Sequence, residues 1–157
     1  MIEAIPMEGM KVSGDLVLVE GTDLPATGER LSIFLSGLTQ AGVNMNLFIG
    51  AKTEEGTQFE CCVAASDEGR VKPLLDGKPE LKTGVEFAAP VDLLTLFPHR
   101  FDLKILGLSL TALGRARIPL HGFCSSLSAI TFITDHTDLE KASAALEGCF
   151  GLGAEPS

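Results

Sequence analysis

Polar residues suited to binding a small zwitterion lie in residues 20–29 of this 157-residue chain, with the sequence Glu-Gly-Thr-Asp-Leu-Pro-Ala-Thr-Gly-Glu. The segment precedes an apolar pattern with helical spacing, and the N-terminal end of a helix attracts a carboxylate through its free N–H groups and positive dipole. Asp23 can pair with an ammonium group. We therefore predict a site for a free amino acid, with candidate contacts Gly21, Thr22, Asp23, Leu24 and Pro25.

Three further candidates follow the predicted helix, at the start of the next strand-like run. They are Asn44, Met45 and Asn46. An amide side chain both donates and accepts hydrogen bonds, so Asn44 and Asn46 suit both charged ends of an amino acid. Asp-x-Pro and Asn are also common in turns and at strand starts, and that structural interpretation stays open beside the functional one.

A secondary group of candidates lies in the second half of the chain: His99, Arg100, Asp102 and His121. Arg100 can bind a carboxylate through two hydrogen bonds, and an ordinary histidine such as His99 titrates near neutral pH. The alternative makes Asp102 the N-cap of a helix and leaves both basic residues in solvent. The loop of residues 97–102 has no glycine that would let the backbone approach a ligand closely. We therefore expect the two candidate loops to differ.

Residue types that would indicate catalysis or metal binding do not cluster in the sequence. The three histidines have no accompanying Cys, Asp or Glu at metal-ligand spacing, and neither a G-x-S-x-G motif nor a phosphate-binding loop occurs. The four cysteines lack C-x-x-C spacing, which favours small buried apolar side chains over a disulfide framework or a zinc site. We predict a protein that is not an enzyme and has no metal or cofactor.

Composition excludes several further classes of function. Twelve basic and 21 acidic residues give a net charge of −9 without any basic stretch, so the chain should repel nucleic acid and anionic membranes. Apolar runs end well before the roughly 20 residues that a membrane span requires, and the acidic N-terminus lacks the basic region of a signal peptide. We expect a cytoplasmic protein.

An internal repeat organises the elements that must position the candidates. Residues 31–45 align without a gap on residues 106–120, and this alignment places Pro119 and His121 opposite Asn44 and Asn46. The apolar pairs are Leu31 with Leu106, Leu35 with Leu110, Leu38 with Leu113, Ala41 with Ala116, and Val43 with Ile118. The spacing predicts one buried stripe on each helix: Leu31, Phe34, Leu35 and Leu38 in the first, and Leu103, Leu106, Leu110 and Leu113 in the second.

Strands are predicted around both helices. Strand-like runs precede and follow each helix, at residues 16–19 and 43–49 in the first copy and at residues 91–97 and 118–124 in the second. A turn and a third strand come next, and a second helix capped by Thr137 or Asp138 follows in the second copy. In the first copy, Gly69 and Pro73 predict only a short or irregular helix before a closing strand at residues 84–87 and a boundary at Pro90.

These patterns predict an α+β fold of two ferredoxin-like βαββαβ modules side by side, each with an antiparallel sheet and its helices on one face. We expect the modules at residues 10–89 and 90–152, followed by a short tail at residues 153–157. The second copy lacks a sixth element, and the alternating segment within residues 1–9 is the candidate for that strand. Four leucines should be buried beneath the helices: Leu35, Leu38, Leu110 and Leu113.

The residues also resemble a known family. Residues 17–25, 33–38, 41–46 and 57–63 are similar to the first ACT repeat of aspartokinase regulatory regions, with its G-x-x-D-x-P-G, I-F-x-x-L, A-G-I-N-I and T-x-I-S-F-T-V motifs. Residues 125–152 are similar to the closing S-x-x-S-I-S-F-V, D-L-x-K-A-x-x-A-L and F-x-L of the second repeat. Asn44 and Asn46 fall in the asparagine-containing motif of the first repeat.

The resemblance implies two ACT modules paired into one sheet, usually within a homodimer, with small effectors such as amino acids bound between modules. It also implies that the segment before the first module completes the second. No kinase domain accompanies the repeats in these 157 residues. The expected function is a regulatory or sensor module that binds a small effector. The alternative is a ligand-free structural module that docks on a partner enzyme.

Overall fold

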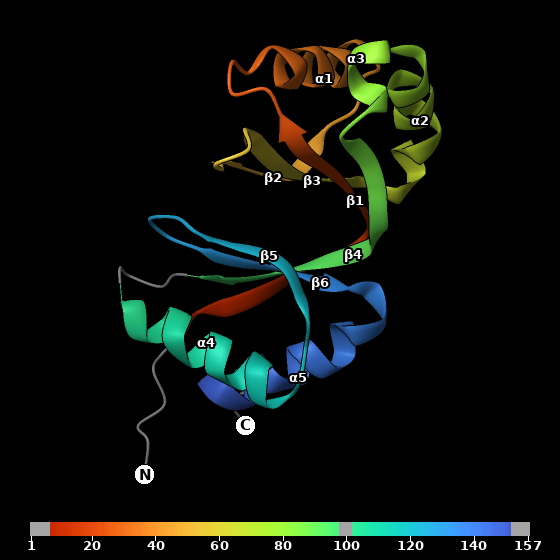
Figure 1. Cartoon of the computed structure of the whole chain (residues 1–157). Coiled ribbons are helices and arrows are strands. Elements are labelled where there is room, and N and C mark those ends of the chain that lie inside the picture. The colour runs from red at the N-terminus through yellow and green to blue at the C-terminus, as the bar shows by residue number, and fades with distance from the viewer. Residues whose placement is uncertain (1–6, 98–101, 152–157) are drawn as a thin grey trace. The chain divides into compact units, whose positions relative to one another are not determined.

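The computed structural model describes residues 7–97 and 102–151 and divides the chain into two compact units. We call Asp15–Val91 the central unit, and Met1–Gly14 with Asp92–Ser157 the terminal unit. In chain order the elements are β1 (Gly9–Leu24), α1 (Glu29–Gln40), β2 (Met45–Lys52), β3 (Thr57–Ala64), η1 (Ala65–Asp67), α2 (Glu68–Gly77), α3 (Pro79–Lys82), β4 (Val85–Phe97), α4 (Leu103–Arg115), β5 (Leu120–Ser125), β6 (Ile130–Asp135), η2 (His136–Asp138) and α5 (Leu139–Phe150) (Figure 1). Strands β1 and β4 each contribute residues to both units.

The central unit has the predicted βαββαβ order. Its strands are arranged β2-β3-β1-β4, and β3 is antiparallel to both β1 and β2. Helices α1 and α2 lie on one face of this sheet (Figure 1). This arrangement confirms the α+β, ferredoxin-like prediction for the first copy.

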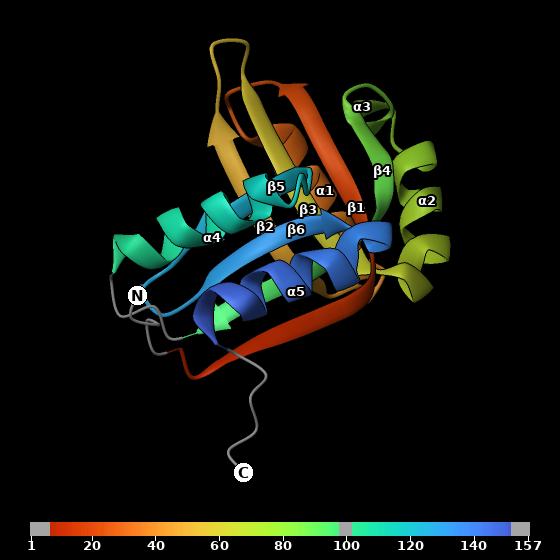
Figure 2. The same ribbon diagram turned by 90° about the horizontal axis from the view of Figure 1, so that it is seen from below.

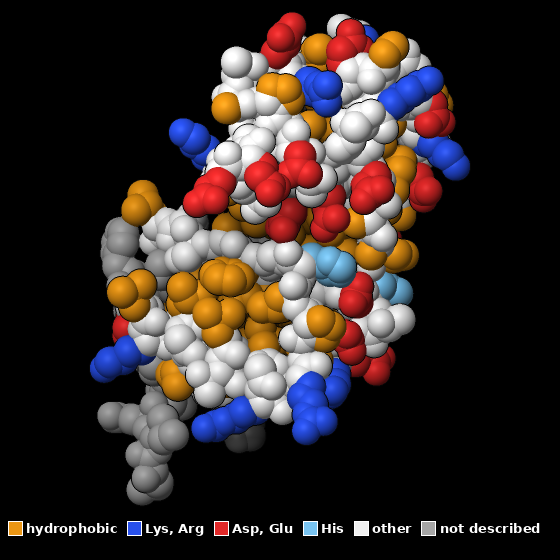
Figure 3. All heavy atoms as spheres, viewed as in Figure 1, with side chains coloured by type: hydrophobic (Ala, Val, Ile, Leu, Met, Phe, Trp, Pro, Cys, Tyr) orange, Lys and Arg blue, Asp and Glu red, His pale blue; other side chains and the backbone are white. Residues whose placement is uncertain are grey.

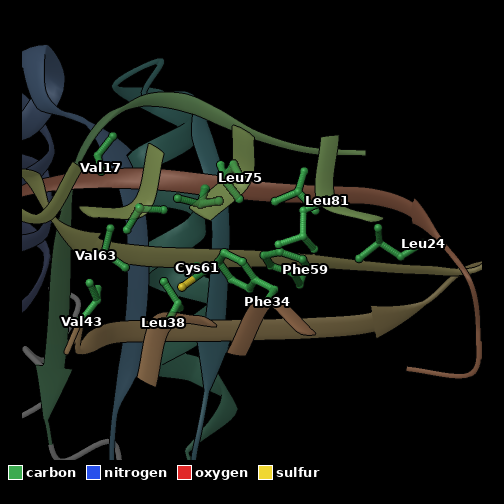
Figure 4. Packing of buried hydrophobic residues seen from close by; sticks show 13 residues of the cluster. Val17, Leu24, Phe34, Leu38, Val43, Phe59, Cys61, Val63, Leu75 and Leu81 are labelled. Carbon is green, nitrogen blue, oxygen red and sulfur yellow. The ribbon is translucent and has the colours of Figure 1, made fainter. Parts of the chain in front are cut away.

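Alternating strand residues and the two helices form the core of the central unit (Figure 4). Val17, Val19, Phe59, Cys61 and Val63 are buried among the residues of this core. The core also contains stacked aromatic rings, since the centroid of the Phe59 ring lies 4.9 Å from that of Phe34 and 5.4 Å from that of Phe48.

The terminal unit contains the other copy. Its strands β4, β6 and β5 are neighbours in that order, and β5 pairs with β6 in antiparallel register. Helices α4 and α5 lie together on one face of these strands (Figures 1 and 2). Gly9–Gly14 of β1 belongs to this unit, and Met7 and Met10 pack against its core. Residues 1–6 of the segment expected to complete this module lie outside the described residues.

The internal repeat is visible in how α1 and α4 end. Both helices stop at an alanine, and the next residue adopts a left-handed backbone: Gly42 with φ +68° and Arg117 with φ +55°. The N–H one residue further on donates back to a leucine carbonyl, in the bonds from Val43 to Leu38 and from Ile118 to Leu113, both 3.0 Å. These bonds define a Schellman motif. The equivalences at the predicted constant offset are therefore confirmed at both helix ends.

The predicted stripe of α4 is wrong at Leu103, whereas Leu113 is buried and Leu106 and Leu110 pack against the core. Leu103 is 79% exposed, and the buried residues are Ile105, Ser109 and Leu113. Ser109 tolerates burial because its hydroxyl donates to the Ile105 carbonyl at 2.7 Å. Of the four leucines expected beneath the helices, Leu38 and Leu113 are buried, whereas Leu35 and Leu110 are only half-buried.

Three predictions about element ends also need correction. Helix α2 is regular over ten residues despite Pro73, because Val71 and Leu75 pack into the core. Strand β4 continues through Pro90, which was expected to mark a boundary. Asp138 makes no side-chain cap to α5, since the 3₁₀ turn of residues 136–138 leads directly into that helix. None of the helices within residues 7–97 and 102–151 is long and apolar enough to cross a membrane.

Candidate functional site

The predicted loop begins at a distortion of strand β1. The pairing of β1 with β3 shifts between Gly21 and Leu24, and Asp23 in between adopts a left-handed φ of +53°. Aspartate is one of the few residues that enter this region readily. Thr22 is held in place because its N–H donates to the Gly84 carbonyl at 2.7 Å. The distortion leaves Asp23 exposed, as a ligand-binding carboxylate must be.

Packing explains Gly21 without a ligand. Gly21 is buried and lies opposite Phe59 in the register of β1 and β3. A Cβ at this position would lie 2.1 Å from the Phe59 ring. The glycine therefore makes room for the ring that stacks against Phe34 and Phe48.

The start of α1 supplies the predicted donors. Gly28 is the N-cap, with φ +72° and no side chain to accept a bond from the first turn. The first backbone bond of the helix runs from Ser32 N to Gly28 O at 2.9 Å. The N–H groups before Ser32 therefore have no N-cap side chain as acceptor and suit an anion. Glu29 lies in the same turn and opposes an anion, whereas the Arg30 guanidinium donates to the Thr83 carbonyl at 3.3 Å.

The structure does not bring the two groups of primary candidates together within the central unit. Leu24 pairs with Thr57 of β3, whereas Met45 pairs with Val63 of the same strand. Thr57 and Val63 are six residue steps apart, which is about 20 Å along an extended strand. Asn44, Met45 and Asn46 are exposed at one end of the sheet, and the loop lies at the other.

The secondary candidates have structural partners where the structure describes them. Asp102 is the N-cap of α4, and its carboxylate accepts from Lys104 N at 2.9 Å, which confirms the capping alternative. His121 Nε2 lies 2.8 Å from the Asp135 carboxylate. His99 and Arg100 fall outside the described residues. The side chains of His121 and Asp102 are therefore less available to bind a ligand than the exposed carboxylate of Asp23.

The cysteine thiols are poor nucleophiles. Burial raises the pKa of Cys61 to about 12, and burial with the neighbouring Cys61 and Glu60 charges raises the pKa of Cys62 to about 12. Burial also raises the pKa of Cys124 and of Cys149. Because the thiolate is the reactive form, these shifts oppose covalent chemistry at neutral pH. Within residues 7–97 and 102–151, no group of three or more His, Cys, Asp or Glu side chains is placed to hold a metal ion.

Sequence reasoning also missed a polar pair with a fully buried carboxylate in the terminal unit. Asp92 is fully buried, and its Oδ2 lies 2.7 Å from His136 Nδ1. The signal was present, since Asp92 is the charged residue in the otherwise apolar start of the predicted strand at residues 91–97. A buried carboxylate requires hydrogen-bonding partners, so the pair fixes the start of η2 against β4.

Comparison with known proteins gives structural matches only. The sequence matches no protein-family model and no curated protein. The regulatory subunit of aspartate kinase from Thermus thermophilus, in its ligand-free form, matches with a TM-score of 0.79 and 14% identity over 92% of this chain and 99% of that chain. A structure of aspartokinase alpha and beta subunits matches with a TM-score of 0.82 and 14% identity over 94% and 100%.

Full-length enzymes match through part of their length. Aspartokinase III from E. coli, in complex with lysine and aspartate, matches with a TM-score of 0.68 and 14% identity over 96% of this chain but 34% of that chain. Identities of this size establish similarity of fold and leave function to be argued from the site. The chain resembles the regulatory subunits and regulatory regions of aspartate kinases and shares their ACT-type fold.

Proposed function

We propose that this chain is a non-catalytic regulatory module that binds a free amino acid as its effector. The observation that supports the proposal most is the extent of the structural match, which covers 99% and 100% of two aspartate kinase subunits, one of them a regulatory subunit. The E. coli enzyme was solved in complex with lysine and aspartate. An amino acid is therefore the first ligand class to test.

The proposed site uses the exposed end of β1 and the start of α1. The first-turn N–H groups of α1 take the ligand carboxylate, and Asp23 takes its ammonium group. Glu29 weakens binding of a simple anion but tolerates a zwitterion, whose positive group offsets the added charge. The loop therefore favours an amino acid over phosphate or another plain anion.

We infer that two copies of the chain complete the site. The loop and Asn44–Asn46 lie about 20 Å apart along the sheet of one central unit, much farther than a free amino acid can reach. In a symmetric dimer, the loop of one copy can meet the start of β2 in a second copy. Asn44 and Asn46 of the second copy then donate to and accept from the ligand.

The second candidate function is a ligand-free interaction module that docks on a partner enzyme. The observation that favours it is apolar exposure in the terminal unit, where Leu103 is 79%, Leu127 74% and Phe123 44% exposed. Figure 3 shows hydrophobic side chains gathered on the surface of this unit. Large exposed apolar side chains in a group are typical of protein interfaces.

A thermal-shift screen of the twenty free amino acids separates the two functions. A ligand present at 100 times its Kd stabilises the folded protein by about 2.7 kcal/mol, which a melting curve detects readily. The effector proposal predicts a concentration-dependent rise in Tm for one or a few amino acids, with sedimentation showing a dimer. A dimer whose Tm no amino acid changes would contradict effector binding and favour the interaction module.

A further inference from the structure

A cavity lies in the central unit and is lined by residues other than the loop candidates. It measures about 400 Å³ and opens between α2, α3 and the first residues of β4, which lie close together in Figures 1 and 2. Its apolar lining consists of Leu75, Val85 and Phe87. Leu75 and Val85 are 6% and 5% exposed and belong to the core, against which the half-buried Phe87 packs. The apolar part of this cavity, which we call the α2–β4 groove, is therefore preformed.

Four charged side chains surround this apolar surface: Lys72, Asp76, Lys82 and Glu86. All four are exposed, and none forms an ion pair or side-chain hydrogen bond with the described part of the chain. Two ammonium and two carboxylate groups thus remain available around one cavity. This balance differs from the rest of the protein, whose net charge is −9.

The two positive and two negative side chains around the groove indicate which class of ligand it can bind. A simple anion is attracted by Lys72 and Lys82 but repelled by Asp76 and Glu86, and a simple cation meets the opposite balance. A zwitterion can satisfy both signs at once. The apolar lining favours a ligand that also has an apolar side chain, and the cavity volume lies within the range of small-molecule sites.

We propose that the α2–β4 groove binds an α-amino acid with an apolar side chain. Its carboxylate pairs with Lys72 and Lys82, its ammonium group pairs with Asp76 and Glu86, and its side chain rests on Leu75, Val85 and Phe87. The groove is a site additional to the loop site of the proposed function. It lies within one central unit and needs no second copy.

The wall of the groove is hydrogen-bonded to the loop. The turn between α3 and β4 accepts two bonds through consecutive carbonyls: Thr83 O from Arg30 Nη1 at 3.3 Å, and Gly84 O from Thr22 N at 2.7 Å. Gly84 has φ +90°, and a Cβ there would lie 2.6 Å from the Thr22 carbonyl oxygen. A ligand that contacts Lys82 and Val85 therefore adjoins the turn that holds both ends of the loop.

Amide chemical shifts of the full chain test the groove directly. Titration with L-leucine, L-valine, L-isoleucine, L-methionine and L-phenylalanine is expected to shift the amides of residues 72–87 for at least one of the five. The α-amide and the N-acetyl derivative of that amino acid each lack one charge and should bind at least about tenfold more weakly. Absence of shifts in residues 72–87 with all five at millimolar concentration would overturn the proposal.

Substitution of the two lysines of the groove tests whether their charges bind the ligand. Lys72→Gln and Lys82→Gln should each weaken binding about tenfold, because each removes a charge-assisted hydrogen bond from an exposed position that does not support the fold. Lys52→Gln, at an exposed lysine of β2, is the matched control and should bind like the wild type. Wild-type affinity in both groove variants would overturn the proposal. Shifts confined to residues 21–30 would also overturn it while supporting the loop site, so the two sites fail separately.

Discussion

Replacing Arg117 by glycine is expected to stabilise the terminal unit. Arg117 follows the last residues of α4 with a left-handed φ of +55°, at the position where the repeated helix α1 has Gly42 at φ +68°. The surrounding hydrogen bonds match in the two copies, including the 3.0 Å bonds to Leu38 and Leu113. The protein thus contains the same helix end once with glycine and once without it.

The expected gain is the difference between two terms. A side chain in the left-handed region costs about 1–2 kcal/mol, which Arg117→Gly removes. Glycine increases the conformational entropy of the unfolded chain and so costs about 0.4–1 kcal/mol. The difference between these two ranges is about 0–1.6 kcal/mol, and its midpoint of about 0.8 kcal/mol corresponds to roughly 3–6 °C in Tm for a unit of this size.

Differential scanning calorimetry of the wild type, Arg117→Gly and Gly42→Ala measures the effect. Gly42→Ala is the mirror experiment and should lose about 0.8 kcal/mol for the same reason. An unchanged or lower stability of Arg117→Gly, beside a destabilised Gly42→Ala, would refute the reasoning. It would show that the Arg117 side chain contributes more than its backbone conformation costs.

Three further predictions concern the stability of the fold: one for a buried glycine, one for a helix cap and one for a buried thiol. Gly21→Ala should lose about 1–3 kcal/mol in urea unfolding, because its Cβ would meet the Phe59 ring at 2.1 Å; a neutral variant would contradict this packing. Asp102→Ala should lose about 1 kcal/mol of cap energy, measured in the same way, with Asp138→Ala near zero as the uncapped control. The pKa of Cys61 is about 12 in the folded protein and 9.0 in its ordinary state, so the unfolded chain loses this thiol proton at a lower pH than the folded protein does. Stability should therefore fall as pH rises from about 9 towards 12, and a Cys61→Ala variant that falls equally would contradict this cause.

Local patterns predict most of the elements. Helical spacing in α1 and α4, and alternation in β3 and β6, are properties of short segments and need no knowledge of the fold. The errors arise where tertiary packing decides. Pro73 weakens α2 in isolation, but burial of Val71 and Leu75 outweighs that preference.

The buried face of α4 cannot be identified from spacing alone. The helix has leucine or isoleucine on nearly every side, so several stripes satisfy a period of 3.6 residues. Burial of Ser109 depends on its own hydrogen bond to Ile105, which no apolar pattern includes. Leu103 lies in the first turn and remains exposed although it fits the predicted stripe.

The candidate site illustrates the difference between motif and geometry. Sequence spacing places Asp23 before and Asn44 after the helix that connects two strands, but it gives no distance between them. Strands β1 and β2 both run antiparallel to β3, so the end of β1 and the start of β2 lie at opposite ends of the sheet. That separation follows from topology and can be derived once the βαβ order is known.

Isothermal titration of the amino acid that raises Tm most, into wild type and Asp23→Ala, tests the effector proposal most directly. Loss of the charge-assisted bond to the ammonium group should weaken binding at least about tenfold in Asp23→Ala. His121→Ala is the control and should bind like the wild type, because His121 is paired with Asp135 in the other unit. Wild-type affinity in Asp23→Ala would contradict the account and place the effector away from this loop.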